Sequence, residues 1–234
     1  MRVALISVHG DPNLQAGGKD AGGMNIYIRE VVEKLSLSDV KVDVFTRDHD
    51  RKNEIEAHQS KLNVKYIKAG DNSLDKIGIY NHIDEFVEGV DNYRIQNNLK
   101  YDLIFAHYWL SGSASLKLKK IWGVPVITTF HTMQEIKQEA FPYNIDDPQR
   151  QAQEKLISQE SDGVVVWSEH EKNFIQSKYN VISNWKKLYA KKPKFAASVP
   201  AAAAAIVASF GPSTPVFALP EGLTVKQGDI TTQT

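Results

Sequence analysis

The sequence predicts an α/β protein in which a parallel sheet is covered by helices on both faces. Short β-branched runs alternate with longer amphipathic stretches along most of the chain, which is typical of that arrangement. The chain has 234 residues and is 42% hydrophobic, enough to bury one sizeable core. The carboxyl ends of parallel strands in such folds usually carry the ligand site, so the loops after the strands are where function is sought.

The expected elements follow one another in order. Strands are predicted at Val3–Val8, Val40–Thr46, Val64–Ala69, Leu103–Ala106, Val124–Phe130 and Gly163–Trp167. Helices are predicted near Met24–Leu37, Asp75–Asn98, Ser111–Ile121, Pro148–Gln159 and Ser168–Lys178.

Local signals support the helices. The first carries an apolar stripe that would pack on the sheet, formed by Ile26, Ile28, Val31, Val32 and Leu35. Pro148 suits a first helical turn, where its missing N–H costs nothing, and Ser168 is a suitable N-cap.

Composition excludes several classes of function. Lys and Arg together number 28, as do Asp and Glu, so the net charge is +0 and no basic footprint indicates nucleic-acid binding. Because there is no cysteine, disulfides and thiolate metal sites are excluded, and with no signal-peptide pattern at the N-terminus we expect a cytoplasmic protein. The seven histidines are scattered without metal-ligand spacing, so no metal site is predicted.

The loop His9–Gly23 joins the first strand directly to the first helix. Gly22 and Gly23 stand where that helix begins, so backbone N–H groups there can face a phosphate or a sugar hydroxyl, helped by the helix dipole. The spacing is not the dinucleotide-binding G-x-G-x-x-G pattern. The alternative is that the glycines only make a tight turn.

Three further loops carry polar and aromatic residues directly after strands. They are Gly70–Lys76, His107–Gly112 and Thr129–Lys137. In a parallel sheet these loops converge at one edge, which makes that edge the candidate site.

Several of these motifs, in this order, resemble the retaining nucleotide-sugar glycosyltransferases of family 4, in the branch of the sucrose-phosphate synthases and the mycothiol-pathway inositol-phosphate glycosyltransferase. The resemblance covers about residues 1–180. It rests on Asp20–Tyr27, Val42–Arg47, His107–Gly112, Phe130–Met133 and the spacing of Arg150, Glu154 and Asp162.

The resemblance implies the N-terminal, acceptor-binding half of a GT-B fold, with a Rossmann-like parallel sheet. It implies that Gly22 and Gly23 approach the donor diphosphate and that His131 contacts the transferred sugar. It also implies acceptor-binding residues: Asp20 and Asn25 beside the acceptor, and Lys76, Tyr108, Thr132 and Arg150 around its phosphate. Lys and Arg would give charge-assisted hydrogen bonds there, and Tyr and Thr neutral ones. The donor would be a nucleotide-sugar such as UDP-glucose, used as a substrate with no separate cofactor.

Plainer interpretations stand beside these roles. Lys76 and Arg150 are also explained as solvated helix charges, and His131 as a hydrogen-bonded histidine at the rim of the sheet. Trp109 is better explained as a packing anchor than as a sugar-stacking platform.

The composition changes after residue 180, which sets a predicted boundary between a domain at 1–180 and an extension at 181–234. A basic stretch, Trp185–Lys194, precedes an alanine-rich segment in which Ala201–Ala208 is predicted to be helical. We expect this extension to replace the donor-binding domain and to cover apolar surface. A membrane anchor is disfavoured by the interior prolines and weak hydrophobicity.

Three functions are consistent with these observations. The first is the acceptor-binding domain of a hexosyl-transferring enzyme whose donor domain is a separate polypeptide or was lost, so that the chain alone is inactive or nearly so. The second is a non-catalytic module that binds a sugar phosphate or polyol phosphate. A generic Rossmann-like domain with another ligand is the third.

Overall fold

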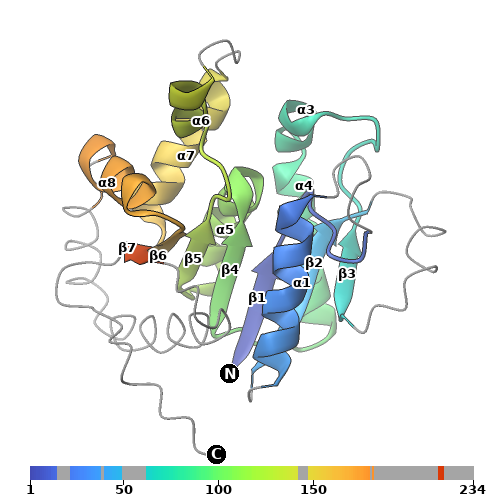
Figure 1. The fold of residues 1–234 in the computed structure, drawn as a ribbon. Coiled ribbons are helices and arrows are strands. Elements are labelled where there is room, and N and C mark those ends of the chain that lie inside the picture. Colours follow the sequence, from blue (N-terminus) through green and yellow to red (C-terminus); the bar gives the residue numbers. More distant parts are fainter. Residues whose placement is uncertain are drawn as a thin grey trace, which may run out of the picture. The chain divides into compact units, whose positions relative to one another are not determined.

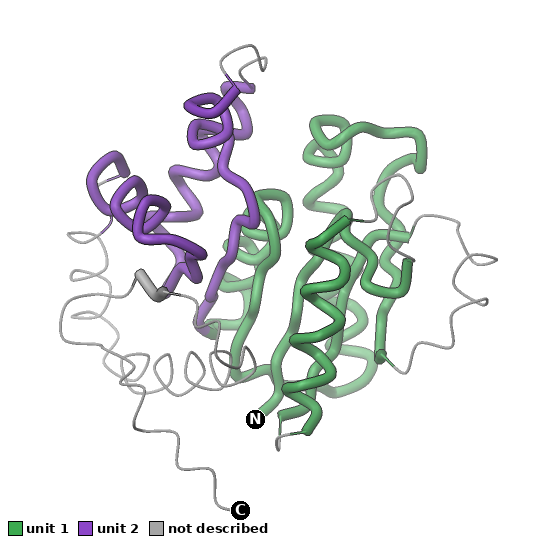
Figure 2. The backbone as a smooth tube through the Cα atoms, in the orientation of Figure 1, with its two compact units in different colours: residues 1–124 green, residues 125–234 purple. Residues whose placement is uncertain are grey.

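The structure is a computed structural model that describes residues 1–14, 22–37, 40–48, 62–141, 147–179, 181 and 216–218. The chain divides into two compact units, residues 1–124 and residues 125–234, which Figure 2 colours green and purple.

Unit 1 contains four strands and four described helices. In chain order they are β1 (Arg2–Ile6), α1 (Gly23–Ser36), β2 (Lys41–Arg47), β3 (Val64–Ile67), α3 (Lys76–Tyr80), α4 (Ile83–Gln96), β4 (Leu103–His107) and α5 (Tyr108–Trp122).

The strands of unit 1 are parallel and run in the order β3-β2-β1-β4. Leu5 of β1 is in register with Val44 of β2 on one side and with Phe105 of β4 on the other, and all three are fully buried. Figure 1 shows α1 in front of the sheet, with α4 and α5 behind it. A β1-α1-β2 crossover and a β3-α4-β4 crossover run in opposite directions, so right-handed connections place their helices on opposite faces. The predicted parallel sheet with helices on both faces is therefore confirmed.

Unit 2 contains β5 (Val126–Thr129), α6 (Gln134–Ala140), α7 (Pro148–Glu160), β6 (Gly163–Val166), α8 (Glu169–Lys178) and β7 (Val216–Ala218). β5 and β6 are parallel, and β7 pairs antiparallel with β6. Pro148 occupies the first turn of α7 and the Ser168 hydroxyl accepts a hydrogen bond from the Glu171 N–H, both as predicted.

Two predicted elements need correction. The helix expected over Asp75–Asn98 is two helices, because the chain breaks at Asn81 and His82, residues with low helix propensity. In α1 the stripe packs as predicted except at Ile26, which is 44% exposed, while Asn25 is buried in its place.

Two elements were not predicted. The helix α6 is short and polar, so it lacked a periodic signal. The strand β7 lies within the segment whose composition indicated an extension. The predicted helix Ala201–Ala208 lies outside the described residues.

No helix in the described part of the chain combines the length and apolar character that crossing a bilayer requires.

Candidate functional site

The carboxyl edge of the unit 1 sheet is formed by the loops that follow β1, β3 and β4. Gly22 is the N-cap of α1 and Gly23 is its first residue, as the sequence predicted. Gly22 has a φ of −120°, and neither glycine is among the described residues with positive φ. A Cβ atom built on either glycine would meet no atom within 4 Å. Among the described residues, therefore, neither backbone strain nor crowding requires glycine here, which weakens the tight-turn alternative and leaves open space at the helix N-terminus.

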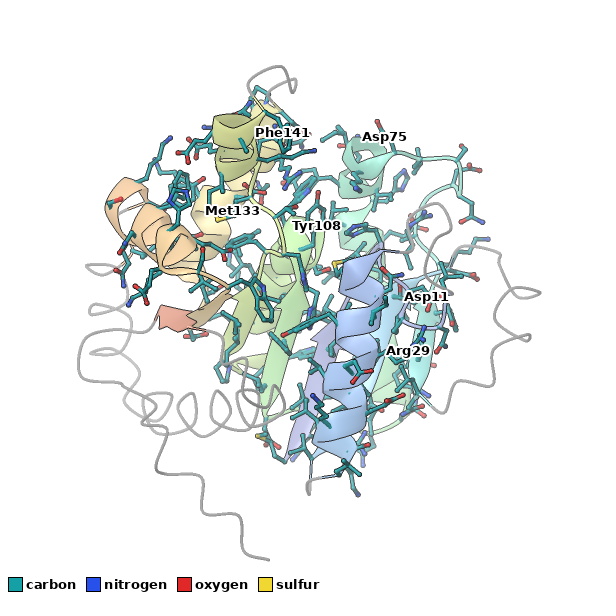
Figure 3. All side chains as sticks on the ribbon, viewed as in Figure 1. Asp11, Arg29, Asp75, Tyr108, Met133 and Phe141 are labelled. Atoms are coloured by element: carbon teal, nitrogen blue, oxygen red, sulfur yellow. The ribbon has the colours of Figure 1, made fainter. Side chains whose placement is uncertain are left out.

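The loop after β1 is tied to α1 by two side chains of that helix. Asn25 is buried and its amide donates to the Asp11 carbonyl at 2.7 Å. Arg29 donates to the Pro12 carbonyl at 2.7 Å and to the Leu14 carbonyl at 3.1 Å (Figure 3 labels Asp11 and Arg29). Asn25 thus shapes the loop that precedes the glycines, and its predicted place beside an acceptor stays a prediction.

Lys76 and Tyr108 lie together although 32 positions separate them in the sequence. The Lys76 ammonium lies 5.5 Å from the centre of the Tyr108 ring. Lys76 is the first residue of α3, where the Asp75 carboxylate caps the helix by accepting the Gly78 N–H at 2.7 Å. Tyr108 is buried, and its ring centre is 4.5 Å from that of His9.

Tyr108 and His131 share an unusual backbone conformation. Their φ angles are +79° and +62°, in the left-handed region, and Asn98 is the only other non-glycine residue of the described chain with positive φ. Asparagine and histidine are enriched in this region, whereas tyrosine reaches it at a cost of order 1–3 kcal/mol. Strain of this kind is concentrated at functional sites, and here it falls on Tyr108, a residue that the sequence had singled out.

A third aromatic contact fixes α3 and was not predicted. Tyr80, at the end of α3, packs against Trp109 of α5 with ring centres 5.4 Å apart. Trp109 is 1% exposed, so the prediction that it is a packing anchor is confirmed. The helical spacing of Tyr80 from Lys76, four residues, was the available signal for their sharing one face.

In unit 2, His131 follows β5 by two residues. Burial lowers the pKa of His131 to about 4, so the imidazole is neutral near pH 7. A neutral imidazole can accept or donate a hydrogen bond to a sugar hydroxyl without placing a charge beside it.

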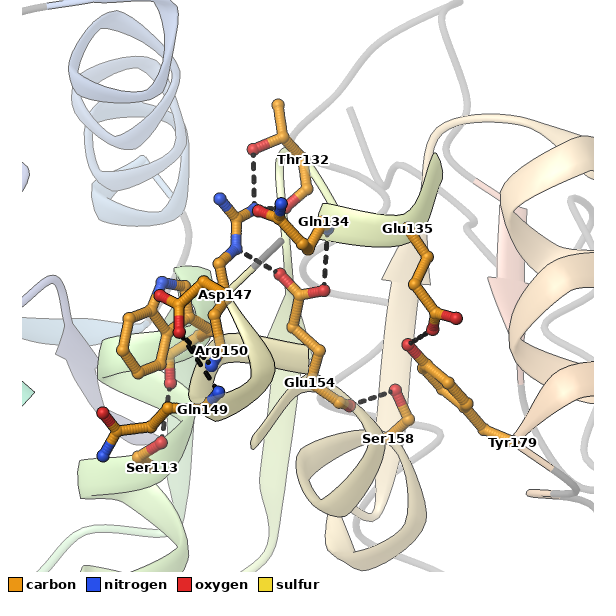
Figure 4. Close-up of polar contacts among 11 residues, drawn as sticks. Ser113, Thr132, Gln134, Glu135, Asp147, Gln149, Arg150, Glu154, Ser158 and Tyr179 are labelled. Atoms are coloured by element: carbon orange, nitrogen blue, oxygen red, sulfur yellow. Dashed lines mark hydrogen bonds and ion pairs between the residues drawn. The ribbon is translucent and has the colours of Figure 1, made fainter. Parts of the chain in front are cut away.

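Arg150 is held in a polar cluster of unit 2, shown in Figure 4. Its Nε donates to Glu154 Oε1 at 2.7 Å, and its Nη2 donates to the Thr132 carbonyl at 2.8 Å. The other Glu154 oxygen accepts the N–H of Gln134, the first residue of α6, at 2.8 Å. Glu154 is fully buried, and burial raises its pKa against the opposing charge of Arg150. The interpretation of Arg150 as a solvated helix charge is therefore wrong.

The structure thus brings the predicted residues together in two pairs, Lys76 with Tyr108 in unit 1 and Thr132 with Arg150 in unit 2. Gly22, Gly23 and Asn25 lie at the start of α1, and His131 stands next to Thr132. Asp20 lies outside the described residues.

Neither of two shallow hollows includes a predicted site residue. One of about 370 Å³ in unit 2 is lined by residues that include Glu135, Lys155 and Lys178, and one of about 450 Å³ in unit 1 is lined by residues that include Arg2 and Asp43. Within the described ranges, no group of three or more His, Cys, Asp or Glu side chains is placed to hold a metal ion.

The fold and the carboxyl-edge loops define a Rossmann-like α/β protein. The sequence profile of Glycosyltransferase Family 4 matches residues 21–186, and the chain belongs to that family. It is 34% identical over 185 residues to the D-inositol 3-phosphate glycosyltransferase of Nocardiopsis dassonvillei, covering 76% of this chain and 43% of that protein. It is 39% identical over 140 residues to the enzyme of the same name from Thermobifida fusca, covering 58% of this chain and 32% of that protein.

A solved structure is similar over the same region. The sucrose-phosphate synthase of Thermosynechococcus elongatus superposes with a TM-score of 0.66 at 31% identity, covering 75% of this chain and 44% of that one. The chain therefore spans less than half the length of these relatives.

Proposed function

We propose that this chain is the acceptor-binding domain of a retaining hexosyltransferase that uses a nucleotide-sugar such as UDP-glucose and an acceptor that is a phosphorylated sugar or polyol. The observation that carries the proposal is the juxtaposition of Lys76 and Tyr108, which bring an ammonium group and a phenol to one place from separate loops. Relatives named for inositol phosphate and sucrose phosphate support a phosphorylated acceptor.

The roles assigned to individual residues follow from their chemistry. Lys76 would pair with the acceptor phosphate and Tyr108 would donate a neutral hydrogen bond to it. In unit 2, Thr132 and Arg150 stay predicted contacts of the acceptor phosphate, and Glu154 keeps Arg150 rigid. The N–H groups at Gly22 and Gly23 would face the donor diphosphate, and His131 would contact the transferred sugar.

In the proposed reaction, the acceptor hydroxyl oxygen bonds to the anomeric carbon of the donor sugar as the bond from that carbon to the diphosphate breaks. The hydroxyl proton passes to an oxygen of the leaving diphosphate, so no protein base is needed. Catalysis is then mainly positioning and electrostatic stabilisation of the leaving group. Neither a cofactor nor a metal is part of this proposal, and the cytoplasmic location stays a prediction.

Calorimetry tests the acceptor site directly. D-inositol 3-phosphate should bind more tightly than inositol, and glucose 6-phosphate more tightly than glucose. Tyr108→Phe, which removes only the hydroxyl, should reduce this preference while leaving the ring beside Lys76. Equal binding of phosphorylated and unphosphorylated ligands by the unaltered chain would contradict the proposal.

Turnover is a separate question because the chain spans less than half of its relatives. With UDP-glucose and the same acceptors, we expect no transfer by this chain alone. Product formed over many turnovers would show that the chain holds the donor without further sequence, and would replace the domain assignment by that of a complete enzyme.

The second candidate function is a non-catalytic module that binds a sugar phosphate. The open space at Gly22 and Gly23 favours the enzyme domain instead, because a module that binds only an acceptor has no use for bare backbone at a helix N-terminus. Binding of UDP-glucose weakened by Gly22→Ala would separate the two candidates.

A further inference from the structure

Arg47 is the most unusual buried side chain of unit 1. It ends β2 and its residue is 2% exposed, placing it among the largest fully enclosed side chains of the described chain. A buried guanidinium is costly unless its N–H groups and its charge are satisfied. The hydrogen bonds that Arg47 makes therefore indicate which part of the chain it stabilises.

Those contacts lie on the loop between β3 and α3. Arg47 Nη1 is 3.4 Å from the Ala69 carbonyl, 3.2 Å from the Asp71 carbonyl and 3.3 Å from Asn72 Oδ1, and it donates toward all three. The guanidinium of β2 thus gathers three acceptors from four consecutive residues of the next loop. Its own backbone is fixed as well, since the Arg47 N–H donates to the Val8 carbonyl at 3.1 Å.

The same loop is also fixed from its other side. Gly70 has a φ of +63°, and a Cβ atom there would come within 2.7 Å of His82 and of Leu74, so only glycine fits. The Gly70 N–H donates to Glu85 at 2.9 Å, and the Asp71 carboxylate accepts the Ser73 N–H at 2.8 Å. Residues 69–75 connect β3 to Lys76 in the chain. Arg47 is therefore one of several groups that hold this connecting loop in place.

We infer that Arg47 is a positioning residue for phosphate recognition: by binding the 69–72 backbone from β2, it sets where Lys76 presents its ammonium over the Tyr108 ring. This inference rests on the proposed function for the role of Lys76. Arg47 acts here through the loop, because Nη1 of its enclosed guanidinium donates toward the loop acceptors.

The test combines a measurement of the loop with a measurement of binding. In Arg47→Met, which keeps the length and fills the buried space, hydrogen exchange of the bonded amides of Gly70, Ser73 and Leu74 should quicken by about tenfold or more. Exchange of the Val44 amide, which donates to Asn63 within the sheet, should change far less. Affinity for D-inositol 3-phosphate should fall by about tenfold, and affinity for inositol should stay the same. Arg47→Lys, which can reach some of the carbonyls, should restore part of the slow exchange and part of the affinity for D-inositol 3-phosphate.

The Arg47→Met experiment has a matched control, Arg29→Met, and a milder variant, Asn72→Ala. Arg29 also donates to loop carbonyls, those of Pro12 and Leu14, so Arg29→Met should quicken exchange in the loop after β1 and leave residues 70–74 unchanged. Asn72→Ala removes a single exposed acceptor and should quicken loop exchange less than Arg47→Met does, while leaving the fold intact. If Arg47→Met fails to fold, Asn72→Ala decides the inference.

The inference is overturned if exchange at residues 70–74 is unchanged in Arg47→Met, or in Asn72→Ala where Arg47→Met does not fold. It is also overturned if this loop loosens while the preference for the phosphorylated ligand is kept. Failure of the proposed function is a different result: the unaltered chain would then bind D-inositol 3-phosphate no better than inositol, whatever Arg47→Met does to exchange.

Discussion

The two cations predicted to meet an acceptor phosphate are held in opposite ways. Lys76 in unit 1 is exposed and lies over an aromatic ring, at the start of a five-residue helix. Arg150 in unit 2 is largely buried, and it is bound to a carboxylate that is itself fully enclosed. A lysine presented over a ring contributes little to the fold, whereas an arginine that neutralises a buried glutamate is part of the core of its unit. Two residues with the same predicted role can therefore differ greatly in how much they stabilise the fold.

The largest expected effect is the loss of Arg150. Arg150→Met leaves the Glu154 carboxylate buried without its cation, which should lower the free energy of unfolding by about 3–5 kcal/mol. Urea denaturation followed by near-ultraviolet circular dichroism measures this. Arg94→Met is the matched control, since Arg94 pairs with Asp91 on a more exposed helix face and should cost under about 1 kcal/mol.

The double variant Arg150→Met, Glu154→Met then shows whether the charge itself is the cause. It should recover much of the lost stability, because two well-packed apolar residues replace a buried pair at little cost. A double variant as unstable as Arg150→Met would mean that the hydrogen bonds to Thr132 and Gln134 matter more than the buried charge.

A second effect concerns the pH dependence of His131. Its pKa is lowered by burial to about 4, whereas the unfolded chain has an ordinary histidine pKa near 6.5. Between these values the unfolded state binds more protons, so stability falls as the pH drops from 6.5 to 4, by up to about 3 kcal/mol, and is unaffected by this group above 6.5.

His131→Asn provides the comparison for that effect. Asparagine tolerates the positive φ of this position but does not titrate, so the variant should lose stability less steeply over the same pH interval. Parallel stability curves for the two proteins would show that other groups cause the acid sensitivity.

Lys76 should behave in the opposite way to Arg150. Lys76→Met should change stability by no more than about 0.5 kcal/mol, yet weaken binding of D-inositol 3-phosphate by about 1.5–3 kcal/mol, roughly 10- to 150-fold. Calorimetry and thermal unfolding of one preparation give both values.

Lys65→Met is a close control for Lys76→Met, because Lys65 of β3 also places its ammonium over an aromatic ring. The ammonium lies 5.2 Å from the centre of the Tyr93 ring. It should leave binding unchanged. A similar loss of affinity in both variants would show that the effect is long-range electrostatics and not contact with the phosphate.

The last prediction concerns the start of α1, where the expected effect is smaller than the loss of binding expected for Lys76→Met. Gly23→Ala should be tolerated or should stabilise the helix by up to about 1 kcal/mol, because alanine is the better helix former and no atom obstructs its Cβ. Gly123→Ala, at a C-cap with a φ of +69°, should destabilise instead. If Gly23→Ala destabilises as much as Gly123→Ala, then glycine is needed there by the fold and not for a ligand.

The sequence was a good guide to the elements and a weaker guide to the site. Strong periodicity predicted six of the strands within a few residues, and helix-start signals at Gly22, Pro148 and Ser168 correctly marked where three helices begin. The short polar helix α6 and the break at Asn81 carried too little local pattern to be predicted. The identity of the site residues came from a motif resemblance, but nothing in the sequence distinguished the exposed Lys76 from the buried Arg150.

By itself, the sequence determined the alternation of strand and helix and the edge of a parallel sheet to which the loops belong, because these follow from periodicity over short stretches. Only the tertiary structure decided that Arg150 pairs with Glu154, that Tyr80 packs on Trp109, and that Arg47 binds the loop leading to Lys76. Such contacts join residues distant in the chain, and their energies depend on burial and angle, which no local pattern encodes.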